Sequence, residues 1–522
     1  MAAYFQSTAS NWGYSSEPQK NACFGMPKNK CLLPRGKVLG GTSSINYMIY
    51  NRGNKKDFDR WAQLGNPGWS YAEVLPYFKK SEKAYLRGGL EDQGYHNYSG
   101  NLNVEYSNFK TNMVHAFVKA SKEIGHPEVD YNGESQLGVS YVQTTTHEGR
   151  RASAAKTFIN PIRNRKNLHI LNFSKVTRII IDPDSKVATG VEFVNNKKRF
   201  AVKVRKEVIL SAGTFNSPQI LMLSGIGPSD NLNAIGVPII KDLPVGKIMY
   251  DHMSHFGPTF ILNSTGNTVR TGDLGIDEIE NYLHKRPSSL SLIGGVEALV
   301  FSKIPNSSQP ADVPDIEYIF VAGSFASDEG TGLKRGANLK TKIYNKVWKP
   351  LVDMKEDHCS VLIMDFHPKS KGRLWLHNRD PFEPPKIDPK YFSNPEDIEH
   401  LLYGVKETIR IFQAPAFQKL GARLLDTPIP GCENYNFGSD DYWRCSIKTV
   451  SLTLHHQVAT CKMGPESDPT TVVNHELKVH GIRGLRVADT SIVPEPPTAH
   501  TNAMSFMIGE KAADMIKAEW KQ

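Results

Sequence analysis

A pair of glycines followed by small polar residues constrains this chain of 522 residues more than any other feature. The segment reads Arg35-Gly36-Lys37-Val38-Leu39-Gly40-Gly41-Thr42-Ser43-Ser44-Ile45-Asn46. Gly40 and Gly41 allow the backbone to turn where a Cβ would obstruct, so main-chain N–H groups can approach a bulky cofactor closely. The hydroxyl and amide side chains that follow add uncharged donors and acceptors. Taken alone, such a cluster is usually an ordinary loop, so its meaning depends on the segments that accompany it.

A second segment has the pattern of a strand, a turn and a helix. Residues 208–210 predict a short buried strand, Gly213 a turn, and residues 217–224 a helix that begins at a Ser-Pro pair and ends before Gly225. The run reads Ser211-Ala212-Gly213-Thr214-Phe215-Asn216-Ser217-Pro218-Gln219-Ile220-Leu221-Met222-Leu223-Ser224-Gly225-Ile226-Gly227.

Two histidines near the other end of the chain, His456 and His500, stand in equally distinctive surroundings. The segments are Leu454-His455-His456-Gln457-Val458-Ala459-Thr460-Cys461-Lys462-Met463-Gly464, Gly484-Leu485-Arg486-Val487-Ala488-Asp489-Thr490-Ser491 and Pro497-Thr498-Ala499-His500-Thr501-Asn502-Ala503. A lone histidine in a buried loop is more often a satisfied core residue than a catalyst. An imidazole with an ordinary pKa of about 6.5 is nevertheless suited to proton transfer near neutral pH.

Together these segments resemble the signatures of the glucose-methanol-choline (GMC) oxidoreductases, and the first match continues through residues 47–53. The resemblance spans nearly the whole chain and is strongest to the insect branch that contains FAD-dependent glucose dehydrogenase. It implies a mixed α/β fold in which an FAD-binding, Rossmann-like domain of GMC type, incomplete at its N-terminus, is interleaved with a substrate domain. The substrate domain is expected to be an antiparallel sheet covered by helices.

The resemblance also implies a division of the chain. Residues 1–255 form the FAD-binding domain with an excursion over about 84–149, residues 256–447 the substrate-binding domain, and residues 448–522 a return to the FAD domain. Alternation and turn residues predict strands at 168–171, 176–181, 187–194, 298–301 and 316–322, and a helix over 395–412.

Roles for particular residues follow from the same resemblance. His456 occupies the position of the catalytic base, and His500 that of the partner that hydrogen-bonds the substrate oxygen. The cofactor-binding positions are Val38, Gly40, Gly41, Thr42, Asn46, Met48, Val176, Ala212, Asp489 and Asn502. Thr501 or Asn502 is expected to cap the last helix, whose N-terminal N–H groups would face the flavin. Ile45 replaces the histidine to which some relatives link FAD, so noncovalent FAD is expected, and His455 is expected to point away.

The implied function is oxidation of the CH–OH group of a small-molecule alcohol or sugar, with quinone or oxygen as electron acceptor. The sequence contains no GxGxxG, the turn that holds the ADP half of FAD in this family. Two alternatives follow: an incomplete gene model, which we favour, or a flavin-free, noncatalytic relative that serves as a binding or structural protein. Uncovered sheet edges would make the chain poorly soluble.

Composition and charge limit the kinds of partner that are expected for this chain. The formal net charge of +10 comes from 63 basic and 53 acidic residues, and the densest basic run, residues 197–206, reads as the solvated face of strands. Because aromatic residues are not interleaved with it, no nucleic-acid partner is expected. No apolar run has membrane-spanning length. His455 and His456 lack a third ligand at convincing spacing, so no metal site is expected.

Six cysteines suggest an oxidising compartment. Cys23 and Cys31 flank one short segment, Cys432 and Cys445 flank another, and two local disulfides would fit. Four glycosylation sequons begin at Asn97, Asn172, Asn263 and Asn306. The complete protein is therefore expected to be secreted and glycosylated, although residues 1–7 have no signal-peptide pattern.

Overall fold

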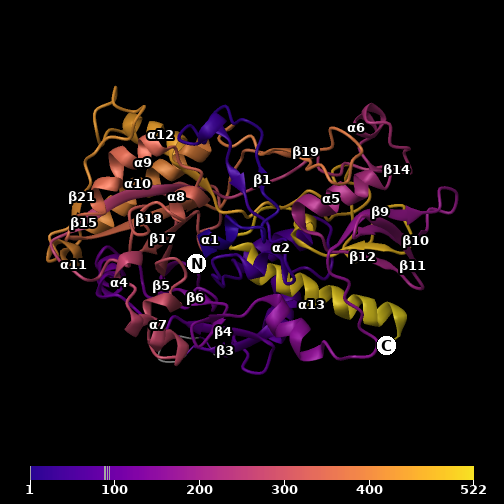
Figure 1. The fold of residues 1–522 in the computed structure, drawn as a ribbon, viewed down its shortest axis with the longest axis horizontal. Helices are drawn as coiled ribbons and strands as arrows, with labels where there is room; N and C mark the ends of the chain where they lie inside the picture. The colour runs from indigo at the N-terminus through magenta and orange to yellow at the C-terminus, as the bar shows by residue number, and fades with distance from the viewer. Residues whose placement is uncertain (1, 87–89, 91, 93, 522) are drawn as a thin grey trace.

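The computed structural model describes residues 2–86, 90, 92 and 94–521. Residues 87–89, 91 and 93 of the predicted excursion, and Met1, lie outside the described residues. Figure 1 shows strands β15, β17 and β18 with helices α10 and α12 in one half of the molecule, and strands β9 to β12 with helix α5 in the other. The C-terminal helix α13 (Thr501–Trp520) runs from the middle of the molecule into the second half (Figure 1).

The largest sheet among the described residues has seven strands, and every pairing in it is antiparallel. Its main path is β21-β15-β18-β17-β16-β5, and β22 adds to β15. The bounds are β5 (Gly138–Tyr141), β15 (Met253–Leu262), β16 (Val296–Ser302), β17 (Ile316–Val321), β18 (Asp357–Asp365), β21 (Arg423–Leu424) and β22 (Ser451–Thr453). This confirms the predicted antiparallel substrate sheet and its strands near 298–301 and 316–322. The domain boundaries themselves stay a prediction.

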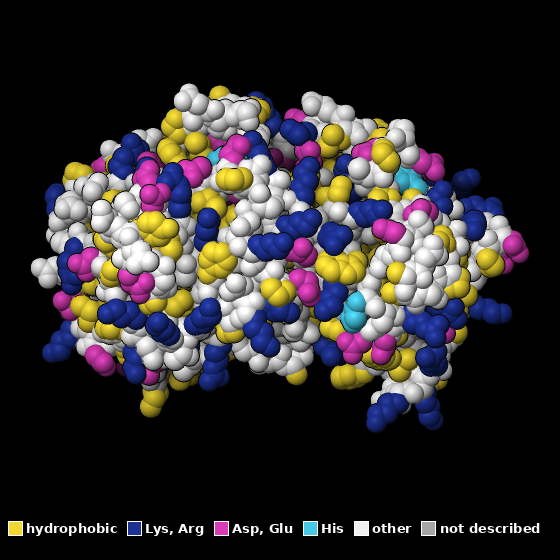
Figure 2. All heavy atoms as spheres, turned by 90° about the horizontal axis from the view of Figure 1, so that it is seen from above, with side chains coloured by type: hydrophobic (Ala, Val, Ile, Leu, Met, Phe, Trp, Pro, Cys, Tyr) yellow, Lys and Arg dark blue, Asp and Glu magenta, His cyan; other side chains and the backbone are white. Residues whose placement is uncertain are grey.

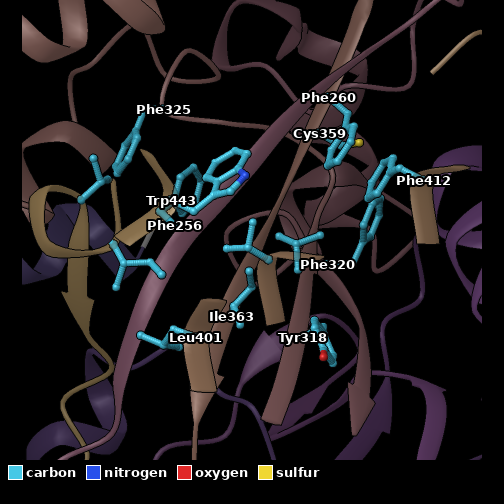
Figure 3. Close-up of a cluster of buried hydrophobic side chains, with 14 of the residues drawn as sticks. Phe256, Phe260, Tyr318, Phe320, Phe325, Cys359, Ile363, Leu401, Phe412 and Trp443 are labelled. Atoms are coloured by element: carbon cyan, nitrogen blue, oxygen red, sulfur yellow. The ribbon is translucent and has the colours of Figure 1, made fainter. Parts of the chain in front are cut away.

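Helices cover one face of this sheet. Every residue of β15, β16 and β17 is buried, which is why these strands are apolar on both faces instead of alternating. The helix predicted over 395–412 is confirmed as α10 (Glu396–Gln413), and it packs on the sheet beside α4 (Asn112–Glu123). Figure 3 shows Phe412 beside Phe260 and Phe320, and the Phe412 and Phe260 rings stack with centroids 3.7 Å apart.

Small sheets and several helices build the second half. The parallel pair β12 (Val208–Leu210) and β23 (Leu485–Val487) brings the second and third sequence segments together. Beside them lies an antiparallel sheet of β9 (Ser174–Ile181), β10 (Ala188–Asn195) and β11 (Lys198–Lys203). Helix α5 spans Gly213–Leu223.

Helix α5 begins four residues before the predicted start at Ser217. Pro218 has no N–H to donate to the carbonyl of Thr214, but the Thr460 hydroxyl donates to that carbonyl at 2.7 Å instead. The helix therefore tolerates a proline within it. The start at Ser217 was wrong because this compensating hydroxyl is distant in the sequence.

The predicted strand at residues 168–171 is also wrong. The segment is irregular, and the side chains of Ile170 and Leu171 are 41% and 62% exposed. No neighbouring strand among the described residues pairs with it, because β9 is the edge of its sheet and begins only at Ser174. Apolar content alone was therefore not enough to make a strand.

Both predicted disulfides are confirmed, Cys23–Cys31 and Cys432–Cys445, while Cys359 and Cys461 are free and buried. On the face drawn in Figure 2, basic side chains are spread out and interspersed with acidic and apolar ones. None of the helices in the described ranges is long and apolar enough to cross a membrane.

A buried charge cluster fastens the predicted excursion to the second half. Arg52 pairs with Glu82 at 2.8 Å, and the His96 ring bridges Glu82 at 2.9 Å and Asp130 at 2.7 Å. Burial alone would lower the pKa of His96, but hydrogen bonds to Asp130 and Glu82 outweigh it and raise that pKa to about 9. Two cations thus balance two carboxylates in a site closed to water.

We expect this cluster to make stability depend on pH. Because the pKa of His96 is raised above its ordinary value, its stabilisation is complete below about pH 6.5 and is lost as the pH rises through about 9. In urea unfolding, the wild-type free energy of unfolding should fall by about 2–3 kcal/mol more over this interval than that of His96→Gln. The exposed His284→Gln variant is the control and should follow the wild type. Parallel curves for wild type and His96→Gln would contradict the assignment.

Candidate active site

A cavity of about 470 Å³ lies where the sequence segments meet the large sheet. Its walls come from residues 41–49, 211–216, 451–457 and 489–506, together with strands of the sheet. Segments that are hundreds of residues apart in the chain therefore enclose one space.

The glycine-rich segment forms one wall. Gly40 and Gly41 have φ of +90° and +57°, and a short 3-10 helix spans Gly41–Ser44. A Cβ on Gly41 would meet nothing within 4 Å, so its backbone borders open space. The Thr42 hydroxyl accepts a hydrogen bond from the Gly36 N–H at 3.2 Å, and the side-chain amide oxygen of Asn46 accepts one from the Met48 N–H at 3.1 Å. These bonds shape the turn so that it presents its main chain to the cavity.

A carboxylate holds the start of α5 against the same cavity. Asp489 accepts hydrogen bonds from the Gly213 N–H at 2.9 Å and the Ser217 hydroxyl at 2.5 Å through one oxygen, and from the Ser491 N–H at 2.8 Å through the other. Gly213 has φ of +84°, and a Cβ there would meet nothing within 4 Å. Ala212 also lines the cavity. Asp489 thus joins the turn after β12 to the turn after β23.

The first turn of α13 points its backbone at the cavity. Neither Thr501 nor Asn502 caps the helix, because the N-cap residue is His500 and no side chain caps it. The Asn502 amide instead donates to the Thr145 hydroxyl at 3.4 Å. Among the described residues, no partner takes the N–H groups of residues 501–503. A helix N-terminus with free donors favours an acceptor that carries negative charge.

His456 and His500 face each other across the cavity wall. Their ring centroids lie 4.8 Å apart with planes at 84°, and both residues are more than nine-tenths buried. The two carboxylate oxygens of Glu317, in β17, lie 3.1 and 3.0 Å from His500 Nε2. The His456 backbone N–H donates to Asp251 at 2.9 Å. The large sheet therefore positions His500 through Glu317, and the loop just before strand β15 positions His456 through Asp251.

A third histidine completes this group. His252 Nδ1 lies 3.1 Å from His456 Nδ1, with the ring planes at 85°. Burial, followed by the nearby His500 and His252, lowers the pKa of His456 well below its ordinary value. Burial and His500 likewise lower the pKa of His252 to about 3. Both rings are therefore neutral at physiological pH, and only one of the two facing nitrogens can carry a proton.

A buried carboxyl group, that of Asp251, and a buried guanidinium group, that of Arg35, lie near the histidines. Burial raises the pKa of Asp251 to about 6, opposed by donors from Thr453 and Tyr391 and by Arg35. Burial also lowers the pKa of Arg35 to about 10, opposed by Asp251. The Arg35 guanidinium donates to the Gln457 side chain and lies over the Phe215 ring. Arg35 thus brings one positive charge to the wall of the cavity.

Most residues predicted from the sequence lie on this cavity, and three do not. Those lining it are His456, His500, Gly41, Thr42, Asn46, Met48, Ala212, Asp489 and Asn502. Val38 is 43% exposed, Gly40 turns toward Ser44 and Ala155, and Val176 lies in β9; none of these three lines it. His455, expected to point away, lines the cavity as well. The cofactor roles of all these residues stay predictions.

Sequence reasoning missed His252, Glu317 and Asp251. Glu317 carried a usable signal, because a carboxylate in the apolar run of β17 must find a partner when it is buried. Asp251 and His252 are two adjacent ionisable residues just before the all-buried strand β15, which is also unusual. Their partners lie about 200 residues away, so the sequence alone could not identify them.

Comparison with known proteins agrees with this arrangement. Residues 16–254 and 368–509 match the N-terminal and C-terminal family profiles of GMC oxidoreductases. The chain is 39% identical to glucose dehydrogenase (FAD, quinone) of Drosophila melanogaster, over 98% of this chain and 78% of that protein. It is 35% identical to oxygen-dependent choline dehydrogenase of Sinorhizobium medicae, over 97% of this chain and 85% of that protein.

Solved structures share the fold. Pyridoxine 4-oxidase from Mesorbium loti superimposes with a TM-score of 0.80 at 25% identity, covering 99% of this chain and 90% of its own. An FAD-dependent oxidoreductase from Chaetomium thermophilum gives 0.82 at 25% identity, covering 98% and 91%. The chain therefore belongs to the GMC oxidoreductases, which are FAD-dependent enzymes.

The cavity fits the flavin-ring half of FAD better than its ADP half. Open backbone at Gly41 and Gly213, and free N–H groups at the start of α13, suit a flat ring system that gains negative charge. For the ADP half, the parallel strands β12 and β23 are present, but the chain contains no GxGxxG turn. The residues that line the cavity thus account for the ring site.

Asp489 should be needed to hold the ring site together. Both carboxylate oxygens of Asp489 accept hydrogen bonds, from three donors in all. Asp489→Asn would replace one of these oxygens with an NH₂ group, so at least one donor would lose its acceptor. We expect the free energy of unfolding, measured with urea and tryptophan fluorescence, to fall by about 1–3 kcal/mol. Asp182, which accepts from the Ser185 N–H and hydroxyl on the surface, supplies the control. Asp182→Asn should change stability by less than about 0.5 kcal/mol, and equal effects of the two variants would refute the role.

Proposed function

We propose that this GMC oxidoreductase oxidises the CH–OH group of an alcohol, with His456 as the base. The observation that carries the proposal is the pair of buried histidine rings, 4.8 Å apart, at the wall of the flavin-sized cavity. A neutral imidazole in a site closed to water can take the hydroxyl proton without first losing one of its own.

Bound FAD would supply the acceptor for the hydride that leaves the carbinol carbon. Gly41, Ala212 and Asn502 would hold its ring, and the first turn of α13 would face its electron-rich edge. Ile45 offers no atom that could form a covalent bond to the flavin, so we propose noncovalent binding. Quinone or oxygen would accept the electrons afterwards.

We propose that His252 sets the tautomer of His456. Two neutral rings that meet through their Nδ1 atoms share one proton between those atoms. If His456 donates from Nδ1, its Nε2 carries a lone pair and can accept the substrate proton. If His252 donates, His456 carries its proton on Nε2 and cannot act as a base. The outer nitrogen of His252, Nε2, is buried and has no hydrogen-bond partner among the described residues.

Glu317 would orient the second histidine. Its carboxylate accepts from His500 Nε2, which leaves Nδ1 of that ring for the substrate oxygen. The Glu317 side chain is fully buried, so its negative charge can offset the positive charge that develops on the neighbouring His456 ring during proton transfer. Substrate, base and partner then lie between the large sheet and the flavin site.

Loss of the base should abolish turnover without emptying the flavin site. For His456→Ala in chain loaded with FAD and desalted, we expect kcat to fall by about 10²–10⁴-fold. The flavin absorption band should be retained at the wild-type level, because the side chain binds no described residue that holds the ring. Activity within about threefold of wild type would rule out His456 as the base.

His252 has a matched control in the same part of the chain. His255 lies three residues after His252 and is also buried. Burial lowers its pKa to about 4, and its ring contacts the Val450 carbonyl. His252→Leu should lower kcat/KM by about 10–100-fold and change the ring ¹⁵N shifts of His456, whereas His255→Leu should leave those shifts unchanged. Unaltered His456 shifts in His252→Leu would end the tautomer proposal.

The overall function is tested by a visible absorption spectrum of the full chain after incubation with FAD and desalting. A retained band that bleaches when alcohols are added without oxygen supports the proposal. A chain that retains no flavin would mean either that this chain is a fragment or that the protein is a flavin-free relative.

We also propose that the protein is secreted and glycosylated. Two disulfides support an oxidising compartment, and the sequon residues Asn172, Asn263 and Asn306 are exposed. Asn97 instead donates its amide to the Lys79 carbonyl and is partly buried. Glycosidase treatment of protein from an insect cell medium should therefore remove glycans from the first three sites.

A further inference from the structure

One wall of the cavity is built on one face of strand β17, and we call this wall the substrate side. Side chains alternate along a strand, so Glu317, Ile319 and Val321 share a face. Glu317 contacts the His500 ring, and Ile319 and Val321 both line the cavity. The face that holds the catalytic pair therefore continues directly into the chamber as aliphatic side chains.

Neighbouring strands widen this apolar wall. In the sheet register, Leu362 of β18 lies across from Ile319, Val296 of β16 lies across from Val321, and Phe256 of β15 lies across from Leu362. All of them line the cavity. The wall beyond the histidines is thus a continuous apolar surface built on four adjacent strands, which fixes its position rigidly.

Polar groups on the substrate side are few and mostly engaged. The Ser451 hydroxyl accepts from the Cys23 N–H at 2.8 Å and donates to the Lys448 carbonyl at 3.3 Å. The Thr453 hydroxyl donates to Asp251 at 2.5 Å and accepts from the His455 N–H at 3.0 Å. Tyr47 and His455 remain to meet a substrate, and a buried nitrogen of His455 has no hydrogen-bond partner among the described residues.

The charged side chains that line the cavity, other than histidines, are on the flavin side. They are Arg35, which binds Gln457, and Asp489, which holds the start of α5. The one carboxylate on the sheet face, Glu317, is taken by His500. An ammonium group on a substrate would therefore meet no free carboxylate at the apolar wall.

We propose that the substrate is an alcohol with an apolar body, such as a cyclic or long aliphatic alcohol, and not a sugar. The proposal rests on the alcohol oxidation proposed above. A sugar carries a hydroxyl on nearly every carbon, and each one buried against this wall without a partner would cost binding free energy. An apolar body gains from the same burial, while the single reacting hydroxyl meets the two histidines. The chain thus departs in substrate from relatives that are named glucose and choline dehydrogenases.

The test compares cyclohexylmethanol with D-glucose and choline on the full chain loaded with FAD. We expect kcat/KM for cyclohexylmethanol to exceed the values for both polar compounds at least about hundredfold. Ile319→Thr and Ile319→Val form a matched pair, because threonine and valine have the same shape and differ in one hydroxyl. For cyclohexylmethanol, Ile319→Thr should show a KM about tenfold higher than Ile319→Val. Equal constants in the two variants would mean that the wall does not contact the substrate, and would overturn the proposal.

A binding measurement separates this proposal from the proposed function. Saturation-transfer NMR of the same preparation reports whether cyclohexylmethanol binds, whether or not it is oxidised. Binding that is weakened in Ile319→Thr but without any turnover would refute the alcohol oxidation and support the apolar chamber. Oxidation of glucose or choline with equal or higher kcat/KM would refute the apolar substrate and leave the oxidation standing. Absence of binding would overturn the apolar chamber itself.

Discussion

The contact between His500 and Glu317 is the interaction on which the rest of the site depends. It joins residues 183 positions apart, one at the start of α13 and the other near the start of β17. Because both groups are buried, neither can be released into water without leaving the other unpaired, which is costly in a protein interior. The contact therefore fixes the distance between the helix that borders the flavin site and the sheet that borders the substrate.

Burial shifts the pKa values of the acid–base groups around this contact so that each group's uncharged form is favoured. It lowers the pKa of His456 and His252, and it raises the pKa of Asp251. Neutral histidines are thus placed close to the free N–H groups of a helix start, and the buried carboxylates Glu317 and Asp251 contact His500 and the His456 backbone. A site arranged in this way can accept a proton on one side and stabilise negative charge on the other, with little solvent between them.

Sequence reasoning was strong where a segment carries its own pattern and weak where a partner is distant. Helix α10 and both disulfides were predicted from local pattern, the antiparallel sheet followed from the resemblance to the family, and all were confirmed. His456 and His500 came from segments that match the family, and their roles stay predictions. Glu317 and His252 were missed because their importance depends on contacts across about 180 to 200 residues. The strand at 168–171 failed because a strand needs a neighbour as well as apolar residues.

The Cys23–Cys31 disulfide closes a small ring against the wall of the cavity. Met26 within the ring and Cys31 both line the cavity, and the Gly25 N–H donates to the Thr449 carbonyl at 2.8 Å just before strand β22. This part of the wall is thus held covalently on itself and by a backbone bond to the segment that leads into the sheet. Because both cysteines are buried, the covalent ring belongs to the packed core, and any change in its shape would be passed to the cavity wall that it forms.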